Sequence, residues 1–131
     1  AWVAVLFIDL NGFKAVNDSM GHASGDLLLQ QIGERLQHGM RPGDSVARMG
    51  GDEFVVAAMC DSREAASAIA QRLIDSMEAP FAINNLKVRI GAAIGISLAR
   101  PGTASAQMLF ENADKAMYQA KARRDGAYQF Y

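Results

Sequence analysis

The sequence predicts a mixed α/β domain of the α+β kind, with a central, mostly antiparallel sheet flanked by helices. Residues 2–8 form an unbroken apolar run, which is typical of a strand covered on both faces. Apolar runs on either side of Gly50 and Gly51 indicate a β-hairpin, because glycine tolerates the positive φ of a tight turn. Elsewhere, apolar residues recur at helical spacing between the strand-like runs, and this mixed order favours helices on the faces of one sheet.

Two helices are expected between the first strand and the hairpin. The strand ends at Asp9, and a short helix after it closes at Gly21. A second helix follows, with Ser24 as its expected N-cap, and it ends at Gly39. The chain therefore begins in the order strand, helix, helix, hairpin.

The second half of the chain is predicted to add a helix, two strands, a last helix and a final strand. Ser62 is the expected cap of the third helix, and Pro80 stops it. Met108 is expected on the inward face of the last helix. The expected ranges are residues 62–77, 86–90, 92–98, 105–123 and 128–131.

Length and composition limit the class of protein. The 131 residues are expected to form a single domain, 1–131, and both ends lie within strand-like runs, which indicates a piece of a larger protein. A net charge of −1 argues against broad binding to nucleic acid or membrane surfaces. No membrane span or signal peptide is visible. The single cysteine, Cys60, excludes an internal disulfide and fits a reducing compartment such as the cytoplasm.

Acidic residues stand at the two places where chemistry is expected. Asp9 ends a buried strand, although a helix N-cap is the alternative role for it. Asp52 and Glu53 directly follow the hairpin glycines, where carboxylates can hold Mg²⁺ and bare main chain can approach phosphate. The alternative is an ordinary acidic turn. Because side chains alternate along a strand, both hairpin acids face the same site only if the turn breaks the pleat.

Three segments match one known family in letters and spacing. Residues 50–54 spell GGDEF, and residues 9–26 follow the pattern D-x-D-x-F-K-x-x-N-D…G-H-x-x-G-D with one exception. Residues 113–121 match A-D-x-A-M-Y-x-A-K. The chain therefore resembles the GGDEF family of diguanylate cyclases over nearly its whole length. That family's D-x-L-T-x-L-x-N-R segment would lie upstream of Ala1, so the domain is expected to be truncated at its N-terminus.

The resemblance implies the palm-like fold of nucleotidyl cyclases and polymerases, with two Mg²⁺ or Mn²⁺ ions that activate phosphoryl transfer. It implies that Asp9, the Leu10 carbonyl, Asp52 and Glu53 hold the metal. Asp52 and Glu53 are the expected catalytic residues, and family precedent favours Asp52 as ligand and base.

The resemblance also implies a nucleotide site. Asn17 and Asp26 match positions that read guanine, and their amide and carboxylate suit its polar edges. A helix C-cap and a helix-dipole partner are the alternative roles of these two residues. The remaining expected substrate-binding residues are Phe13, Lys14, Gly50, Gly51 and Lys121. Taken singly, Lys14 and Lys121 each have a simpler alternative role as a solvated lysine on a helix surface.

A second, inhibitory site is implied by Arg41 and Asp44, which match the R-x-x-D product site of the family, and by Arg72. The alternative is a Pro-Gly turn with a local Arg–Asp pair.

Three residues depart from the family pattern. Asn11 replaces an acid, Gly12 replaces a bulkier residue, and Asp125 stands where an arginine contacts phosphate. An acid beside phosphate is unfavourable and is expected to weaken activity unless Arg123 or Arg124 substitutes.

The resemblance implies a diguanylate cyclase that condenses two GTP molecules into cyclic di-GMP in a homodimer, under product inhibition. The alternative is an inactive GTP- or cyclic di-GMP-binding module that regulates an attached EAL phosphodiesterase domain, since residues 128–131 resemble the ending of such GGDEF domains. A different nucleotidyl cyclase on the same palm is a third possibility. Sensory domains are expected in the parent protein, with this domain facing the cytosol.

Overall fold

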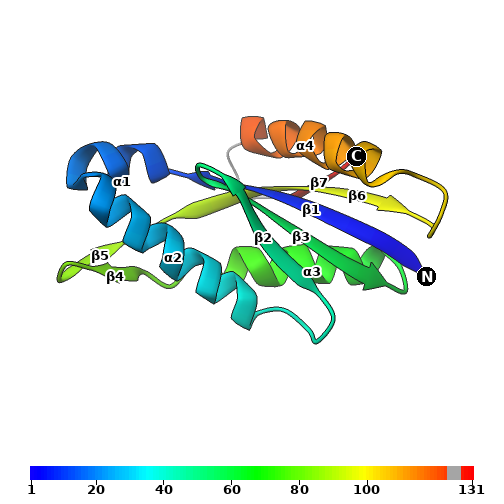
Figure 1. The fold of residues 1–131 in the computed structure, drawn as a ribbon, viewed down its shortest axis with the longest axis horizontal. Helices are drawn as coiled ribbons and strands as arrows, with labels where there is room; N and C mark the ends of the chain where they lie inside the picture. Colours follow the sequence, from blue (N-terminus) through cyan, green and yellow to red (C-terminus); the bar gives the residue numbers. More distant parts are fainter. Residues whose placement is uncertain (124–127) are drawn as a thin grey trace.

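The computed structural model describes residues 1–123 and 128–131 and arranges them around one sheet (Figure 1). The elements in chain order are β1 (Trp2–Asn11), α1 (Phe13–Met20), α2 (His22–His38), β2 (Ser45–Gly50), β3 (Glu53–Cys60), α3 (Arg63–Ser76), β4 (Phe81–Ile83), β5 (Leu86–Val88), β6 (Gly91–Ala99), α4 (Ala106–Arg123) and β7 (Tyr128–Phe130).

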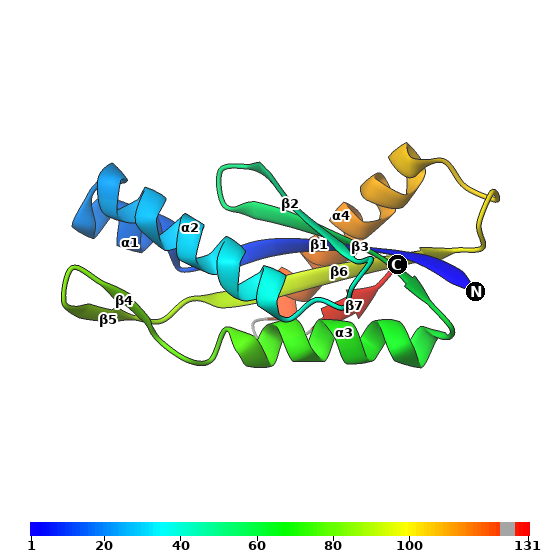
Figure 2. The same cartoon turned by 60° about the horizontal axis from the view of Figure 1, so that its bottom comes forward.

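The main sheet has five strands in the order β2-β3-β1-β6-β7. The central strand β1 pairs antiparallel with β3 on one side and with β6 on the other, while β7 pairs parallel to β6. Helices α2 and α3 lie on one face, and α4 lies on the other (Figures 1 and 2). The predicted fold class is confirmed, including the mostly antiparallel sheet.

Both faces of β1 are buried, as its apolar sequence predicts. Leu6 and Ile8 pack into the larger core cluster beneath α2 and α3. Val5 and Phe7 point to the opposite face, where they pack against α4. The alternation continues to Asp9, which therefore falls on the α4 face.

Helix capping agrees with the sequence at α3 but not at α2. The Ser62 hydroxyl accepts the Ala65 N–H at 3.1 Å, as expected for an N-cap. The prediction for Ser24 is wrong, because α2 already begins at His22, directly after Gly21 with φ 92°. Ser24 is instead buried within the helix, where its hydroxyl accepts a hydrogen bond from Asn84 Nδ2 at 2.8 Å.

Two further sequence predictions need correction. Residues 81–83 form the short strand β4, which pairs with β5 through a turn at Asn84 and Asn85, both with positive φ. Three-residue strands carry too short a pattern to be recognised by alternation. Met108 is 54% exposed, because it points away from the buried stripe of α4, which starts at the next residue, Leu109.

Helix α4 rests directly on β6 because Gly95 has no side chain. A Cβ at this position would lie 2.0 Å from the Ala113 carbonyl oxygen and 2.2 Å from the Met117 nitrogen. The helix backbone therefore fixes the choice of glycine here, and this contact sets the height of α4 above the sheet.

We expect Gly95→Ala to lower the free energy of unfolding by about 1–3 kcal/mol or more, because α4 must move away from the sheet. Gly91→Ala, in the same strand, is the matched control, since its Cβ would meet Asn11 at an ordinary 3.6 Å. Urea denaturation measures both variants. Equal urea midpoints for Gly95→Ala and Gly91→Ala would show that the contact at Gly95 does not hold α4 in place.

Candidate active site

The end of β1 is joined to the tip of the β2–β3 hairpin. In the strand register, Asp9 lies opposite Glu53, so their side chains share one face. The Leu10 N–H donates to the Asp52 carbonyl oxygen at 3.3 Å, just beyond the last strand pair. The acids that the sequence analysis singled out on two separate segments are thus brought together.

The hairpin turn depends on its two glycines. Gly50 has φ 147° and Gly51 has φ 50°, and the strand register shifts between Arg48 and Gly50. Positive φ at consecutive positions favours glycine. The turn thus leaves Asp52 outside the regular pleat, while Glu53 starts β3.

A lysine from the far end of the chain completes this cluster. Lys121, in the last turn of α4, donates from Nζ to Asp9 Oδ2 and forms an ion pair with it. This hydrogen bond raises the pKa of Lys121. The N-cap alternative for Asp9 is wrong, because Gly12 occupies the cap of α1 and no side chain bonds there.

Glu53 lies in an acidic environment. Burial raises the pKa of its carboxyl, and the nearby charges of Asp9, Asp114 and Asp52 raise it further, while Lys121 opposes them. Asp114 was missed as a member of this cluster. It lies seven residues before Lys121, two turns earlier on the same face of α4, and that spacing was a usable signal.

The donor set fits a divalent cation bound together with phosphate. Among residues 1–123 and 128–131, no three His, Cys, Asp or Glu side chains are arranged to hold a metal ion by themselves. Mg²⁺ usually takes only one or two carboxylates from the protein and completes its shell with water and substrate phosphates. Asp9 and Glu53 lie opposite each other, and the charge of Asp52 acts on Glu53 from nearby, so this cluster can supply that number of carboxylates.

The residues predicted to read guanine lie on α1 and α2. The Asn17 side chain is within hydrogen-bond distance of His22 Nδ1, at 3.1 Å, while its main-chain carbonyl accepts the C-cap N–H of Gly21. The Asn17 side chain is therefore not the cap. A Cβ on Gly25 would lie 2.2 Å from Asn17 Oδ1, so Gly25 is needed for this packing, a role that sequence reasoning missed.

Three other predicted substrate residues lie on the same two helices. Asp26 is exposed on α2 and lines a hollow that also includes Arg48 and Phe54. A Cβ on Gly25 would also lie 3.4 Å from the Phe13 ring, so this ring lies close to Gly25, as the Asn17 side chain does. Lys14 is exposed on α1, one residue further along.

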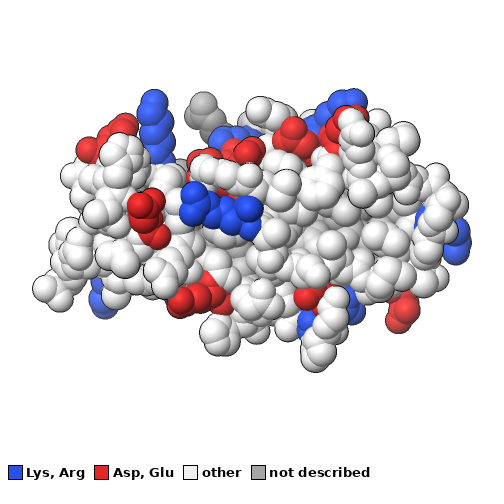
Figure 3. Space-filling view, viewed as in Figure 1, with Lys and Arg blue, Asp and Glu red and all other residues white. Residues whose placement is uncertain are grey.

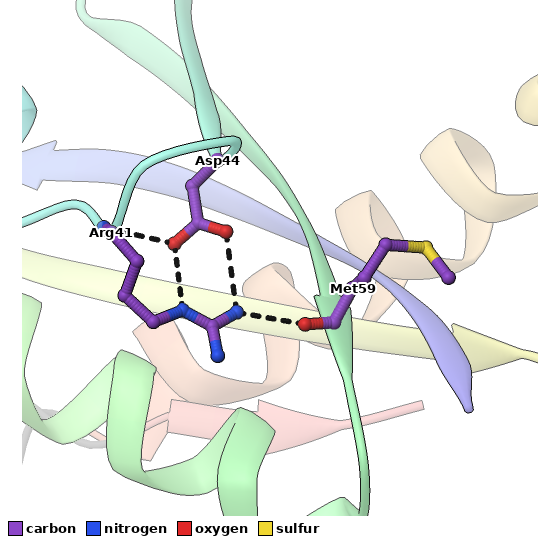
Figure 4. Close-up of polar contacts among 3 residues, drawn as sticks. All are labelled: Arg41, Asp44 and Met59. Atoms are coloured by element: carbon purple, nitrogen blue, oxygen red, sulfur yellow. Dashed lines mark hydrogen bonds and ion pairs between the residues drawn. The ribbon is translucent and has the colours of Figure 1, made fainter.

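Arg41 and Asp44 form the local pair that the turn alternative describes (Figure 4). The Arg41 guanidinium donates from Nε and Nη2 to the two Asp44 oxygens, at 3.1 and 3.2 Å, and from Nη2 to the Met59 carbonyl at 2.8 Å. The hydrogen bond with Asp44 raises the pKa of Arg41. The pair borders a surface hollow with Pro42 and Gly43. Arg72 is exposed on α3 and is not among the residues that line this hollow.

The departures from the family pattern have different surroundings. Gly12 has φ 88°, so a bulkier residue there would be strained. Asn11 ends β1 and lies opposite Gly91 of β6 in the strand register. Asp125 and Arg124 lie outside the described residues. Arg123 donates from Nη1 to Gln129 Oε1 at 3.0 Å, which links α4 to β7.

Charged side chains of both signs gather around the β2–β3 turn (Figure 3).

The model of the family described as "Diguanylate cyclase, GGDEF domain" matches residues 1–127. The chain belongs to the GGDEF family. This GGDEF domain is 45% identical, over 130 residues, to the bifunctional diguanylate cyclase/cyclic di-GMP phosphodiesterase MucR of Pseudomonas aeruginosa. That match covers 98% of the chain but 19% of MucR, so the chain spans about a fifth of this relative.

Two further similar proteins support the assignment to this family. Diguanylate cyclase DgcP of Escherichia coli is 36% identical over 93% of the chain and 36% of its own length. The crystal structure of the GGDEF domain of PA1120 from P. aeruginosa superposes with a TM-score of 0.92 at 40% identity, covering 98% of the chain and 81% of that structure. None of the helices that the structure describes has the length and apolar character needed to cross a bilayer.

We expect Glu53→Gln to stabilise the metal-free GGDEF domain at pH 7. The pKa of Glu53 is raised in the folded state, so the folded protein keeps this proton to a higher pH than the unfolded chain does. Wild-type stability therefore falls as the pH rises from the ordinary carboxyl pKa through the raised pKa of Glu53. The gain should be about 1 kcal/mol or less at this partly exposed site. It should vanish below about pH 4, where the carboxyl is protonated in both states.

Thermal melting at pH 4 and pH 7, with chelator present, measures this gain. Glu34→Gln, on the exposed face of α2, is the control and should change the melting temperature little at either pH. A Glu53→Gln protein no more stable than wild type at pH 7 would contradict the burial and the acidic surroundings of this carboxyl.

Proposed function

We propose that this GGDEF domain condenses two GTP molecules into cyclic di-GMP and releases pyrophosphate. The observation that carries the proposal is the meeting of Asp9, Asp52 and Glu53 at the joined ends of β1 and the hairpin. Curated relatives named as diguanylate cyclases, including TpbB of P. aeruginosa at 42% identity, support it.

Each residue of the cluster has a task in this proposal. Asp9, the Leu10 carbonyl, Asp52 and Glu53 would hold Mg²⁺ or Mn²⁺, which when bound supplies charge neutralisation for phosphoryl transfer. A carboxylate oxygen of Asp52 is the proposed acceptor of the proton from the attacking 3′-hydroxyl. The bare main chain at Gly50 and Gly51 lets phosphate oxygens approach closely.

The helices α1 and α2 would hold the nucleotide. Asn17 and Asp26 are proposed to bind the polar edges of guanine, with Phe13 against the base. Lys14 and Lys121 would bind phosphate oxygens. A site that hydrogen-bonds one base rejects another strongly, because the unpaired polar groups lose their partners.

The reaction requires two protomers. Each holds one GTP, and the 3′-oxygen of one nucleotide bonds to the α-phosphorus of the other as the bond to the β-phosphate breaks. One protomer cannot complete a cyclic product from two nucleotides, so a homodimer is proposed. The parent protein is proposed to carry sensory and EAL domains and to place this domain in the cytoplasm, where GTP is available.

We expect Asp9→Asn and Asp52→Asn each to lower the rate of cyclic di-GMP formation by at least about a thousandfold, or ~4 kcal/mol, since a metal ligand is lost. Incubation with GTP and Mg²⁺, followed by product analysis, measures this rate. Asp75→Asn is the matched control, because Asp75 accepts a hydrogen bond from Gln71 on the surface of α3, outside the proposed site, and this variant should keep full activity.

ATP in place of GTP separates a different nucleotidyl cyclase from the proposed enzyme, which should form no product from ATP. Near-normal synthesis by the Asp9 or Asp52 variant would refute the proposed site, and a cyclic product from ATP would refute the proposed substrate.

Product inhibition is proposed at Arg41 and Asp44. Arg41 offers planar donors that suit guanine or phosphate, and Asp44 holds them in place in the free domain. Arg72 is proposed to join the bound product, although the free domain does not place it at the hollow. Product at this surface would hold protomers apart, so inhibition would follow from its preference for one arrangement.

We expect cyclic di-GMP to bind an Asp52→Asn protein with a Kd in the micromolar range, about −8 kcal/mol, and Arg41→Ala to weaken this binding at least tenfold. In the otherwise unmutated enzyme, Arg41→Ala should relieve inhibition without lowering the initial rate. Calorimetry measures the binding, with Arg89→Ala, an exposed arginine elsewhere, as control. Unchanged affinity after Arg41→Ala would mean that residues 41–44 form only a turn.

A binding module without catalytic activity is the second candidate. The cyclic di-GMP phosphodiesterase NbdA of P. aeruginosa is 39% identical over 98% of the chain, so a relative named only for the opposite activity contains a matching segment. A solved structure of an EAL/GGDEF domain protein from M. capsulatus matches at 37% identity with a TM-score of 0.91. GTP binding without turnover, in a protein that extends beyond both ends of this chain, would favour this candidate.

A further inference from the structure

We propose that Lys121 and the divalent cation exchange places at Asp9. Lys121 and Asp9 form an ion pair, so the Lys121 ammonium is the counter-ion of this carboxylate, and an arriving cation would release it toward the nucleotide phosphates. The inference rests on the proposed function, since it concerns how the same site loads its cation.

Asp9 needs a counter-ion in the free domain. Its side chain is 11% exposed beneath α4, and a carboxylate so little hydrated is costly without a partner. Glu53 directly opposite and Asp52 beside it add negative charge of the same sign. Lys121 Nζ bonds Asp9 Oδ2 and so satisfies the most enclosed acid of the cluster.

Lys121 is also able to leave. Its side chain is 45% exposed, and a flexible four-carbon stem carries the ammonium from the last turn of α4. Here the acid is enclosed and the base is at the surface, so movement of the lysine disturbs little of the core.

The cation and the ammonium compete for the same carboxylate. Both are positive, so they repel when they share one small acidic group. The cation carries two charges and compensates two of the three acids at once, whereas Lys121 compensates one. Cation binding therefore favours release of Lys121, and the freed ammonium is then available for phosphate. In this proposal, the affinity of the domain for the nucleotide phosphates depends on prior binding of the metal ion.

The first measurement is the affinity for Mn²⁺ alone, by calorimetry without nucleotide. We expect Lys121→Met to bind Mn²⁺ at least about tenfold more tightly than wild type, because the competing ammonium is gone. Lys115→Met is the matched control, since this exposed lysine lies on the same helix outside the cluster, and it should bind as wild type does.

The second measurement follows the ammonium itself, by NMR of ¹⁵N-labelled lysine side chains, with the Lys121 signal assigned by its loss in Lys121→Met. Addition of Mg²⁺ should move this signal to the position of solvent-exposed lysines and leave Lys115 unchanged. A Lys121 signal that stays in place while Mg²⁺ saturates the site would overturn the exchange, as would equal Mn²⁺ affinity of Lys121→Met and wild type.

The same experiments separate the exchange from the proposed function. If Asp9→Asn abolishes Mn²⁺ binding while Lys121 neither moves nor competes, the metal site stands and only the exchange is refuted. If neither wild type nor Lys121→Met binds Mn²⁺, the metal site is refuted and the exchange with it.

Discussion

The pairing of β1 with β3 is the constraint on which the site depends. The register runs without a break from Trp2 opposite Cys60 to Asp9 opposite Glu53. A slip of one residue would turn Asp9 toward the face covered by α2 and α3, into an apolar core where a carboxylate has no partner. The alternation that buries Leu6 and Ile8 on one face is thus the same alternation that delivers Asp9 to the other. Stability of the core and composition of the site are specified together.

The second constraint is the height of α4 above the sheet. Without a side chain at Gly95, the helix backbone approaches β6 closely enough for Lys121 to reach across to Asp9. A similar close approach at Gly25 lets Asn17 pack against α2 beside Asp26. In both places a missing methyl group, rather than an added interaction, determines where a polar side chain ends up. The polar groups of the proposed site therefore depend on backbone contacts some distance from them.

Much of the fold could be predicted from local sequence because its signals are local. The apolar run of β1, the glycine pair of the hairpin and the Ser62 cap each lie within a few residues, and each prediction was confirmed. The pairing of Lys121 with Asp9 could not be predicted from local sequence patterns. The two residues are 112 positions apart, and only the packing of α4 on the sheet brings them together. The Ser24 prediction failed because Gly21 turned the chain into the helix three residues earlier. The strand β4 was missed because its partner β5, not its own pattern, makes it a strand.

The bond between Arg123 and Gln129 gives the end of α4 a second role. Lys121 and Arg123 lie in the same final turn, so one helix end contacts both the carboxylate at Asp9 and the edge strand β7. A displacement of β7 that keeps the Arg123–Gln129 bond would shift this turn, and with it the Lys121 side chain at Asp9. By thermodynamic reciprocity, a change in the Lys121–Asp9 pair would bias the position of β7 by the same coupling free energy. The last turn of α4 therefore couples the carboxylates at the end of β1 to the edge of the sheet.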